Sequence, residues 1–224
     1  IDMQEVLHHQ LEVLKTGLPE YTVVGVGRED GKTAGEYAPI FFKQAKYTLL
    51  DQNTFWLCEK PDSVGMVGWD AALTRIATWV KLQDKKTGQI LMVVNTHFDH
   101  IGTEARRNSA LLIIEKIKEI VGTSPAILTG DFNVSEDWDA YKTITNNEFI
   151  LKDAHKVAGK RTGVDFTYHN FGKIPAEKCE KIDFIFVTPQ IRVISSYIPF
   201  SQLNDTLFLS DHNPEIVELE IEKS

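Results

Sequence analysis

Cysteine is scarce in this sequence, which holds only Cys58 and Cys179 among its 224 residues. Two cysteines cannot build a disulfide-rich scaffold, and no CxxC pair indicates a zinc site. One disulfide and two reduced, partly buried thiols both remain open. Because the sequence also has no run of 18 or more apolar residues, it predicts no membrane-spanning helix.

Positive charge is in short supply. There are 24 Lys and Arg residues against 32 Asp and Glu residues, and the formal net charge is −8. Tight binding to duplex nucleic acid depends on clustered Lys and Arg. The balance therefore argues against high-affinity duplex binding, although a local basic cleft is still allowed.

An initiator methionine is also missing, since the first residue is Ile1. This favours a fragment or a processed product, from which any targeting signal would already be gone. We expect a soluble protein, either cytoplasmic or exported after removal of an N-terminal signal. The oligomeric state stays open.

The length and the hydrophobic share of 42% are typical of one globular domain, here residues 1–224, with a sizeable core. Apolar spacing predicts an opening helix that includes Met3 and Leu14, and a longer helix over Thr103–Val121. In the longer helix the spacing places one apolar stripe along Leu111, Ile114, Ile117 and Ile120 or Val121. Strand patterns outnumber the helices and alternate with them, which predicts a mixed α/β domain with sheet packed on sheet as one possible core.

The stretch AILTGDFN, residues 126–133, is a buried strand that ends in polar side chains. Asp131 and Asn133 are two residues apart, so in an extended chain they face the same side. A turn is the alternative interpretation, because Asp and Asn often bond nearby backbone N–H groups.

Four other segments repeat this theme. His97 and Asp99 follow an apolar strand, Asp211 and His212 precede the last strand, and Glu5 lies on the opening helix. Each of these residues also has an ordinary structural interpretation as a turn, a cap or a buried histidine. Asp183 is the hardest to explain in that way, because a carboxylate in the run IDFIFV is costly to bury without a partner. Together these groups favour one site whose oxygen ligands, without cysteine, suit Mg²⁺ or Mn²⁺.

The motifs QEV, GEY, NTHFDH, GDFN, KIDFIFV and SDH occur here in an order that resembles the endonuclease/exonuclease/phosphatase superfamily. The resemblance covers Glu5 to Pro214. It implies a four-layer α/β sandwich of two packed mixed β-sheets flanked by helices. It also implies divalent-metal-dependent hydrolysis of phosphoester bonds.

The resemblance assigns a role to each matching residue. As catalytic residues it gives His97, Asp131, Asp183, His212 and Glu36. For substrate binding it gives Arg75 and Asn133. For the metal it gives Glu5, Asp131, Asn133 and Asp211. The carboxylates of Asp183 and Glu36 would orient His212 and His97, respectively, and a pair of this kind fixes the imidazole tautomer and raises its basicity.

The start of the chain departs from the family pattern. In that pattern, a strand carrying an asparagine precedes the helix that contains the QEV motif. We therefore expect an N-terminally incomplete domain that lacks this first strand and one active-site amide. A further strand, from an upstream segment or from another chain, should fill the gap.

The substrate stays open among a nucleotide, a sugar phosphate and a phospholipid headgroup. The aromatic side chains of Tyr37, Phe41, Phe42 and Trp69 could stack on a base or sugar, although aromatic residues beside strands are more often core. Two alternatives to a phosphodiesterase or phosphatase remain: an endo- or exonuclease acting on nucleic acid, and a catalytically inactive binding module on the same scaffold.

Overall fold

A six-stranded sheet forms the centre of the computed structural model, which describes residues 1–122, 124–146, 151–204 and 207–221. The strand order is β3-β4-β5-β6-β9-β7. β5 and β6 run parallel and the other neighbours antiparallel, so the sheet is mixed. The strands span Tyr47–Trp56 (β3), Ile76–Asp84 (β4), Ile90–His97 (β5), Ala126–Asp131 (β6), Lys152–Asp153 (β7) and Asp183–Val187 (β9).

A second layer of strands packs on one face of this sheet and is divided into two parts. One part pairs β1 (Tyr21–Val24) with β2 (Ile40–Lys43), and the other has the order β13-β10-β8. β10 runs antiparallel to β13 and parallel to β8. The strands of the second part are Ile191–Ile198 (β10), Lys160–Gly163 (β8) and Ile216–Ile221 (β13). β11 (Gln202–Asn204) and β12 (Leu207–Phe208) pair antiparallel in a separate two-stranded sheet.

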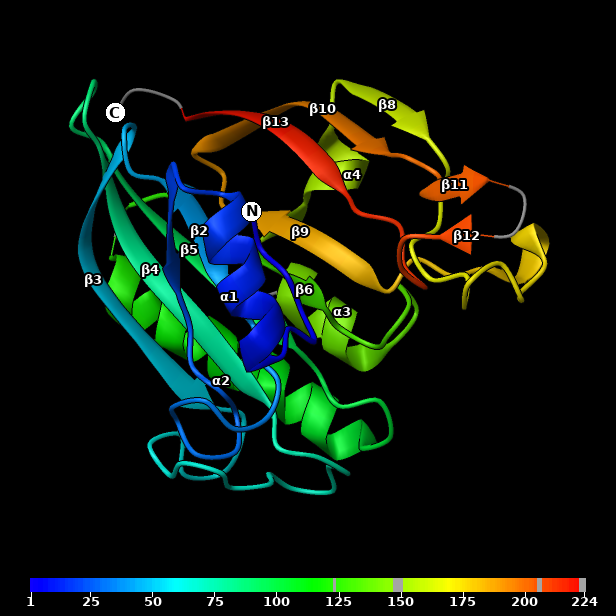
Figure 1. Cartoon of the computed structure of the whole chain (residues 1–224), viewed down its shortest axis with the longest axis horizontal. Helices are drawn as coiled ribbons and strands as arrows, with labels where there is room; N and C mark the ends of the chain where they lie inside the picture. Colours follow the sequence, from blue (N-terminus) through cyan, green and yellow to red (C-terminus); the bar gives the residue numbers. More distant parts are fainter. Residues whose placement is uncertain (123, 147–150, 205–206, 222–224) are drawn as a thin grey trace.

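The helices complete four layers (Figure 1). α2 covers the outer face of the six-stranded sheet through residues such as Ile113 and Ile117, and α1 covers β1 and β2 through Leu11. Val80, Val93 and Val193 belong to the apolar core between the two strand layers. The helices span His8–Gly17 (α1), Thr103–Val121 (α2), Asp139–Thr145 (α3), Ala154–Val157 (α4) and the 3₁₀ turn Ala176–Lys178 (η1). This arrangement confirms the predicted mixed α/β sandwich.

The start of the chain differs from the prediction of an opening helix at Met3. Ile1–Met3 is extended beside β2, with Asp2 opposite Ile40, and Val6 pairs with Tyr37. These backbone pairings override the helical spacing of the apolar residues, and α1 begins only at His8. Glu5 therefore lies in the turn before the helix, at φ +60°.

Two simpler expectations can also be compared with the structure. Both cysteines are free, and Cys58 is buried. Within the described ranges, no helix is both long and apolar enough to cross a membrane.

Candidate active site

Three neighbouring strands of the central sheet carry a functional side chain at the same level. β5 ends at His97 and β6 ends at Asp131, and these residues are register partners. β9 runs antiparallel to β6 and begins at Asp183, which is the register partner of Asp131. The sheet therefore brings together residues that lie 34 to 86 positions apart in the sequence, as the strand-end pattern predicted.

His212 reaches this sheet edge from the segment before β13. Its Nδ1 lies 2.7 Å from Oδ2 of Asp183, as predicted for this pair. Its Nε2 lies 4.0 Å from Oδ2 of Asp131. The Tyr168 ring packs on the imidazole, with ring centroids 5.0 Å apart, and the two residues form an antiparallel bridge. The imidazole is thus held between a carboxylate and an aromatic ring.

The pKa values of these residues are shifted in different directions by their surroundings. Burial and the nearby charge of Asp183 raise the pKa of Asp131 to about 7. Burial disfavours the charged form of His212, but its hydrogen bond to Asp183 and the surrounding carboxylates outweigh burial and raise its pKa to about 9. The pKa of His97 is held well below its ordinary value, first by burial and then by Arg75 and Arg28. Two imidazoles at one site thus have opposite tendencies to carry a proton.

Glu5, Glu36 and His97 form a second group, whose ligand atoms lie within 4.8 Å of one another. The predicted hydrogen bond between Glu36 and His97 is wrong, because none joins them in the described part of the chain. Arg28 instead donates from Nη1 to Oε2 of Glu36 at 2.5 Å. His97 turns its Nε2 toward Asp131, at 3.5 Å from Oδ2.

Arg75 is a buried cation beside the site, 4% exposed. Its Nε lies 3.5 Å from Oδ1 of Asp99, and its Nη2 lies 3.2 Å from Nδ1 of His100. Its Nη1 is buried without a hydrogen-bond partner among the described residues. A buried guanidinium N–H without a partner is costly, so this atom favours an anionic ligand.

Asp99 fixes the position of Arg75. Its carboxylate accepts backbone N–H bonds from Ala72, Leu73, Ile101 and Gly102. Burial opposes the charge, but these backbone bonds lower the pKa of Asp99 to about 2. The turn interpretation of Asp99 is therefore right, and the same turn also supports a site residue.

For Asn133, both interpretations of the GDFN stretch apply: it forms a turn, and it lies beside Asp131 at the candidate site. It sits at φ +50°, and its backbone N–H donates to Oδ1 of Asp131 at 2.9 Å, which is a turn. Its side-chain Nδ2 donates to the carbonyl of Phe98 at 3.0 Å. Non-glycine residues at positive φ are uncommon and occur often at functional sites. The turn itself holds Asn133 beside Asp131.

Asp211 lies at the rim, outside both compact groups of possible ligand atoms. Its backbone carbonyl accepts from the N–H groups of His169 and Asn170. Burial raises the pKa of Glu5, and the charges of Glu36 and Asp211 raise it further. Asp211 therefore acts electrostatically on Glu5.

Arg28 was missed by the sequence analysis. It lies in the polar loop REDGKTAGEY and is 8% exposed, and its pairing with Glu36 depends on how that loop folds back. The only signal in the sequence was an arginine in the same Gly-containing loop as GEY.

Comparison with known proteins decides the family. The model of the endonuclease/exonuclease/phosphatase family matches residues 3–212. The chain belongs to this family. Members of this family are generally hydrolases that act on phosphoesters, and the comparisons do not determine a substrate for this chain.

Three proteins similar to this chain differ in how much of the sequence they share with it. A crystal structure of an endonuclease/exonuclease/phosphatase from Bacteroides vulgatus is 65% identical, with a TM-score of 0.96, and the match covers 99% of this chain and 84% of that chain. The mannosyl-6-phosphatase of Bacteroides thetaiotaomicron is 37% identical, with a TM-score of 0.91, over 98% of this chain and 84% of that chain. Uncharacterized protein L388 of Acanthamoeba polyphaga mimivirus is 30% identical over 220 residues, which are 94% of this chain and 80% of that protein.

The endonuclease/exonuclease/phosphatase family uses divalent metals, and the donor set here fits such an ion. In the group Glu5, Glu36 and His97, two carboxylates face each other, and their repulsion contributes to the raised pKa of Glu5. In the group Asp131, Asp183 and His212, a protonated His212 already supplies positive charge. Hard oxygen atoms with excess negative charge suit Mg²⁺ or Mn²⁺, so the Glu5 group is the better fit.

Proposed function

We propose that this protein is a divalent-metal-dependent phosphoester hydrolase and that its substrate is a sugar phosphate monoester. The observation that carries the proposal is the meeting of His97, Asp131, Asp183 and His212 at one sheet edge, beside the buried Arg75. Hydrolysis of a phosphoester needs an oriented water, a base and positive charge on the phosphoryl oxygens. This edge holds side chains that can serve each of these needs.

Asp131 is the proposed base that orients the attacking water. With a pKa of about 7, a large share of this carboxyl group is ionised at neutral pH. A general base works best when its pKa lies near the operating pH. Its Oδ2 faces the Nε2 atoms of His97 and His212 at 3.5 and 4.0 Å. A water bound to Asp131 would therefore have imidazole groups on two sides.

His212 is the proposed donor to a phosphoryl oxygen. Its pKa of about 9 keeps it protonated at neutral pH, with Nδ1 bonded to Asp183 and Nε2 free to donate. A protonated imidazole cannot accept the proton of water. Steadying the phosphoryl oxygens is therefore favoured as the role of His212 over activation of the water.

Arg75 is the proposed clamp for the substrate phosphate. Its buried Nη1 has no partner in the described chain, and a phosphoryl oxygen would satisfy it. Asp99 holds the guanidinium through Nε, which lies 3.5 Å from its Oδ1. Asn133, fixed in the turn beside Asp131, is the proposed second contact to phosphate or metal.

Glu5 is the proposed direct metal ligand, with Glu36 beside it and Asp211, Asp131 and Asn133 around it. When bound, Mg²⁺ or Mn²⁺ would supply positive charge for the phosphoryl and leaving oxygens. Arg28 neutralises one oxygen of Glu36 and so sets which carboxylate atoms face the site.

The substrate class is supported by the relative that is a mannosyl-6-phosphatase, 37% identical to this chain over nearly its whole length. The net charge of −8 also disfavours a long polyanion such as duplex DNA. A small monoester carries its charge on one phosphate, which the buried Arg75 can contact.

A phosphoester panel with Mg²⁺ tests the proposal. It contains mannose 6-phosphate, glucose 6-phosphate, a nucleoside 5′-monophosphate, phosphocholine and a single-stranded oligonucleotide. We expect the hexose phosphates to be hydrolysed fastest, EDTA to stop the reaction, and His212→Gln to lower kcat by roughly 10²–10⁴. His9→Gln, an exposed histidine on α1, is the matched control and should keep full activity. Faster cleavage of the oligonucleotide would overturn the substrate class, and an active His212→Gln variant would overturn the mechanism.

A further inference from the structure

Asp183 and His212 form a hydrogen bond although the segments that carry them belong to different layers. Asp183 begins β9 of the central sheet, and His212 lies just before β13 of the second strand layer. β9 pairs with β6 and β7, and β13 pairs with β10, so no ladder among the described residues joins β9 to β13. The 2.7 Å distance between Nδ1 of His212 and Oδ2 of Asp183 therefore depends on contacts outside the ladders.

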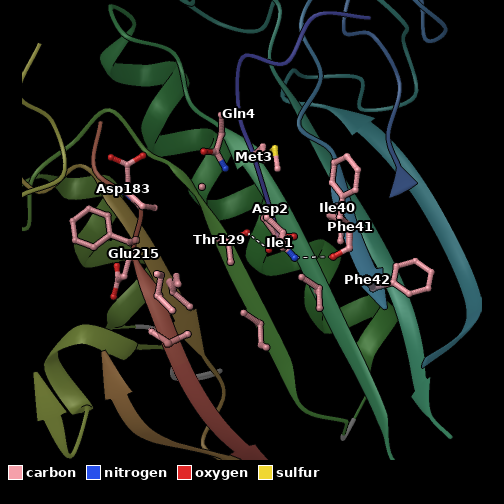
Figure 2. Close-up of a pocket in the computed structure, with 18 of the residues that line it drawn as sticks. Ile1, Asp2, Met3, Gln4, Ile40, Phe41, Phe42, Thr129, Asp183 and Glu215 are labelled. Carbon is pink, nitrogen blue, oxygen red and sulfur yellow. Dashed lines mark hydrogen bonds between the residues drawn. The ribbon is translucent and has the colours of Figure 1, made fainter. Parts of the chain in front are cut away.

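A buried ion pair joins these two segments. Lys181 lies two residues before Asp183, and Glu215 lies three residues after His212. Nζ of Lys181 donates to Oε2 of Glu215 at 2.8 Å and to the backbone carbonyl of Asp183 at 2.6 Å. The side chains of Lys181 and Glu215 are only 7% and 2% exposed. Figure 2 shows Asp183 and Glu215 on the same side of a pocket that both of them line.

The ammonium group of Lys181 has a third partner in β9. Its Nζ lies 4.0 Å from the ring centroid of Phe184, which is buried. A cation over the face of an aromatic ring is attracted to it electrostatically. Two hydrogen bonds and one ring thus fix the ammonium group beside the start of β9.

The second carboxylate oxygen of Glu215 is bonded to β10. Ser196 of β10 is fully buried and donates from Oγ to Oε1 of Glu215 at 3.1 Å. Nδ1 of His155 lies 2.8 Å from the same Oγ. Because the one hydroxyl proton of Ser196 goes to Glu215, the His155 N–H donates to Ser196. Both oxygens of Glu215 therefore have partners, and a satisfied buried network of this kind favours one arrangement of its members.

The burial of two charges calls for an explanation other than stability. Moving both ions out of water costs free energy that their attraction often fails to offset, and apolar residues of similar volume are often at least as stabilising. In some proteins buried polar groups instead specify one conformation. Here the pair connects the backbone of Asp183 with the segment that carries His212.

We propose that the Lys181–Glu215 ion pair positions His212 against Asp183. The pair draws the start of β9 toward the segment before β13, and so keeps Nδ1 of His212 within hydrogen-bond distance of Asp183. Lys181 and Glu215 act through these two neighbours and are positioning residues. The expected effect on catalysis rests on the proposed function, whereas the effect on the hydrogen bond does not.

Neutral contacts should keep the fold intact without the ion pair. The carbonyl of Thr167 accepts from the N–H of Asn213 at 2.7 Å. Its Oγ1 accepts from the N–H groups of Ile182 and Asp183 at 3.0 and 3.1 Å. A protein without the ion pair should therefore keep both segments in place, but hold them less closely.

The test replaces Lys181 with Met and Glu215 with Gln together. This double variant leaves no unpaired ion, and the Gln oxygen can still accept from Ser196. Its melting temperature should stay within about 5 °C of that of the unmodified protein. On the fastest substrate of the phosphoester panel, kcat should fall by about 10- to 100-fold, because a catalytic group is misplaced. KM should change by less than about 3-fold, because the contact of Arg75 with the phosphate is unaltered.

Proton NMR of the metal-free protein gives a readout that needs no substrate. The Nδ1–H of His212 should give a downfield signal, because it donates to a carboxylate. His212→Gln removes this signal and so identifies it. In the double variant the signal should broaden or disappear, because the hydrogen bond to Asp183 is no longer held in place.

Two further variants complete the test. Lys116→Met with Glu119→Gln removes an exposed ion pair of α2 and should keep both the signal and kcat. Glu215→Gln alone keeps the shape of the side chain and should cause the same changes to a smaller extent, so it decides the question if the double variant does not fold.

The NMR signal separates the failure of this proposal from the failure of the proposed function. A folded double variant, or in its place Glu215→Gln, that keeps a sharp His212 signal would overturn the positioning role, whatever happens to kcat. A lost signal with unchanged kcat would support the positioning role and overturn the proposed catalytic role of His212.

Discussion

At the residue scale, the neighbouring carboxylates keep His212 protonated. An ordinary histidine is mostly neutral at pH 7.5, but the hydrogen bond to Asp183 and the charges of Asp131 and Asp211 raise the pKa of His212 to about 9 against the effect of burial. His97, at the same sheet edge, is buried near two arginines and has the opposite tendency. Neighbouring charges, rather than residue type, separate the proposed roles of the two histidines.

Replacing Asp183 with Asn should lower the pKa of His212. The substitution keeps the shape of the side chain but removes the negative charge that favours the imidazolium. In metal-free protein, NMR titration of the imidazole nitrogens should show a value well below about 9. Asp165→Asn changes an exposed carboxylate near His155 and should leave the His212 titration unchanged. An unshifted His212 in Asp183→Asn would mean that Asp183 does not control its charge.

The lowered pKa of Asp99 predicts the pH range over which its carboxylate stabilises the fold. Its pKa is about 2 in the folded chain and ordinarily 3.8, so its contribution is fully present above about pH 4. The contribution is lost as the pH falls toward 2. Asp99→Asn should lower the free energy of unfolding by about 2–3 kcal/mol at pH 7, because the buried hydrogen bonds lose a charged acceptor. The variant should also lose less stability than the unmodified protein as the pH falls from about 4 toward 2.

Urea unfolding between pH 7 and pH 2 checks this prediction. Asp62→Asn, at an exposed position, is the matched control and should follow the unmodified protein. An Asp99→Asn variant with the same stability at pH 7 and the same acid limb would contradict the account of Asp99.

The raised pKa of Glu5 predicts where a cation binds. Burial and the charges of Glu36 and Asp211 disfavour its ionised form, and a divalent ion would reverse that. Calorimetry with Mn²⁺ should show that Glu5→Gln weakens binding by more than about 100-fold, since even outer-shell partners cost roughly 10–100-fold. Glu20→Gln, an exposed glutamate, should bind as the unmodified protein does. Equal Mn²⁺ affinity in Glu5→Gln would move the site away from Glu5.

The residues that sequence alone could identify share one property: each is polar in an apolar or strand-end context. Asp183 stands out within IDFIFV, and Asp131 and His97 end buried strands, so their convergence was predictable. Arg28 was not predictable, because its contact with Glu36 depends on the path of an irregular loop. Loop paths follow from specific turns and contacts rather than from a periodic pattern.

At the element scale, periodicity located the long helix α2 and most of its buried face. The limits of α2, Thr103–Val121, agree with the prediction, and Ile114, Ile117 and Val121 of the predicted stripe are buried, but Leu111 is 47% exposed. The buried face also includes Ala110 and Ile113, which belong to the same core cluster, and α2 also contacts α3. Small residues such as Ala110 give a weak hydrophobic signal even where they mark the closest contact.

The difference between Leu111 and the buried members of the stripe can be measured. Ile117→Ala should lower the free energy of unfolding by about 2–5 kcal/mol, because it leaves a cavity in a fully buried site. Leu111→Ala should cost less than about 1 kcal/mol, because the leucine is half exposed. Chemical denaturation of both variants measures the two losses, and equal losses would mean that Leu111 lies on the buried face after all.

At the scale of the whole molecule, the layers were predictable but the division of the second layer was not. Alternating strand and helix patterns indicate sheets packed between helices. Which strands become neighbours depends on contacts between distant residues, such as that between Asp2 and Ile40. The extended Ile1–Met3 segment could not be read from apolar spacing, since Met3 and Leu7 also fit a helix.

The central claim is that water attacks the phosphorus of a phosphoester at the edge that carries Asp131 and His212. Hydrolysis of mannose 6-phosphate in ¹⁸O-labelled water, followed by ³¹P NMR and mass spectrometry of both products, tests it most directly. The account predicts one ¹⁸O atom in the released inorganic phosphate, none in the sugar, and no product in the presence of EDTA. Label in the sugar hydroxyl, or equal hydrolysis with EDTA, would contradict it.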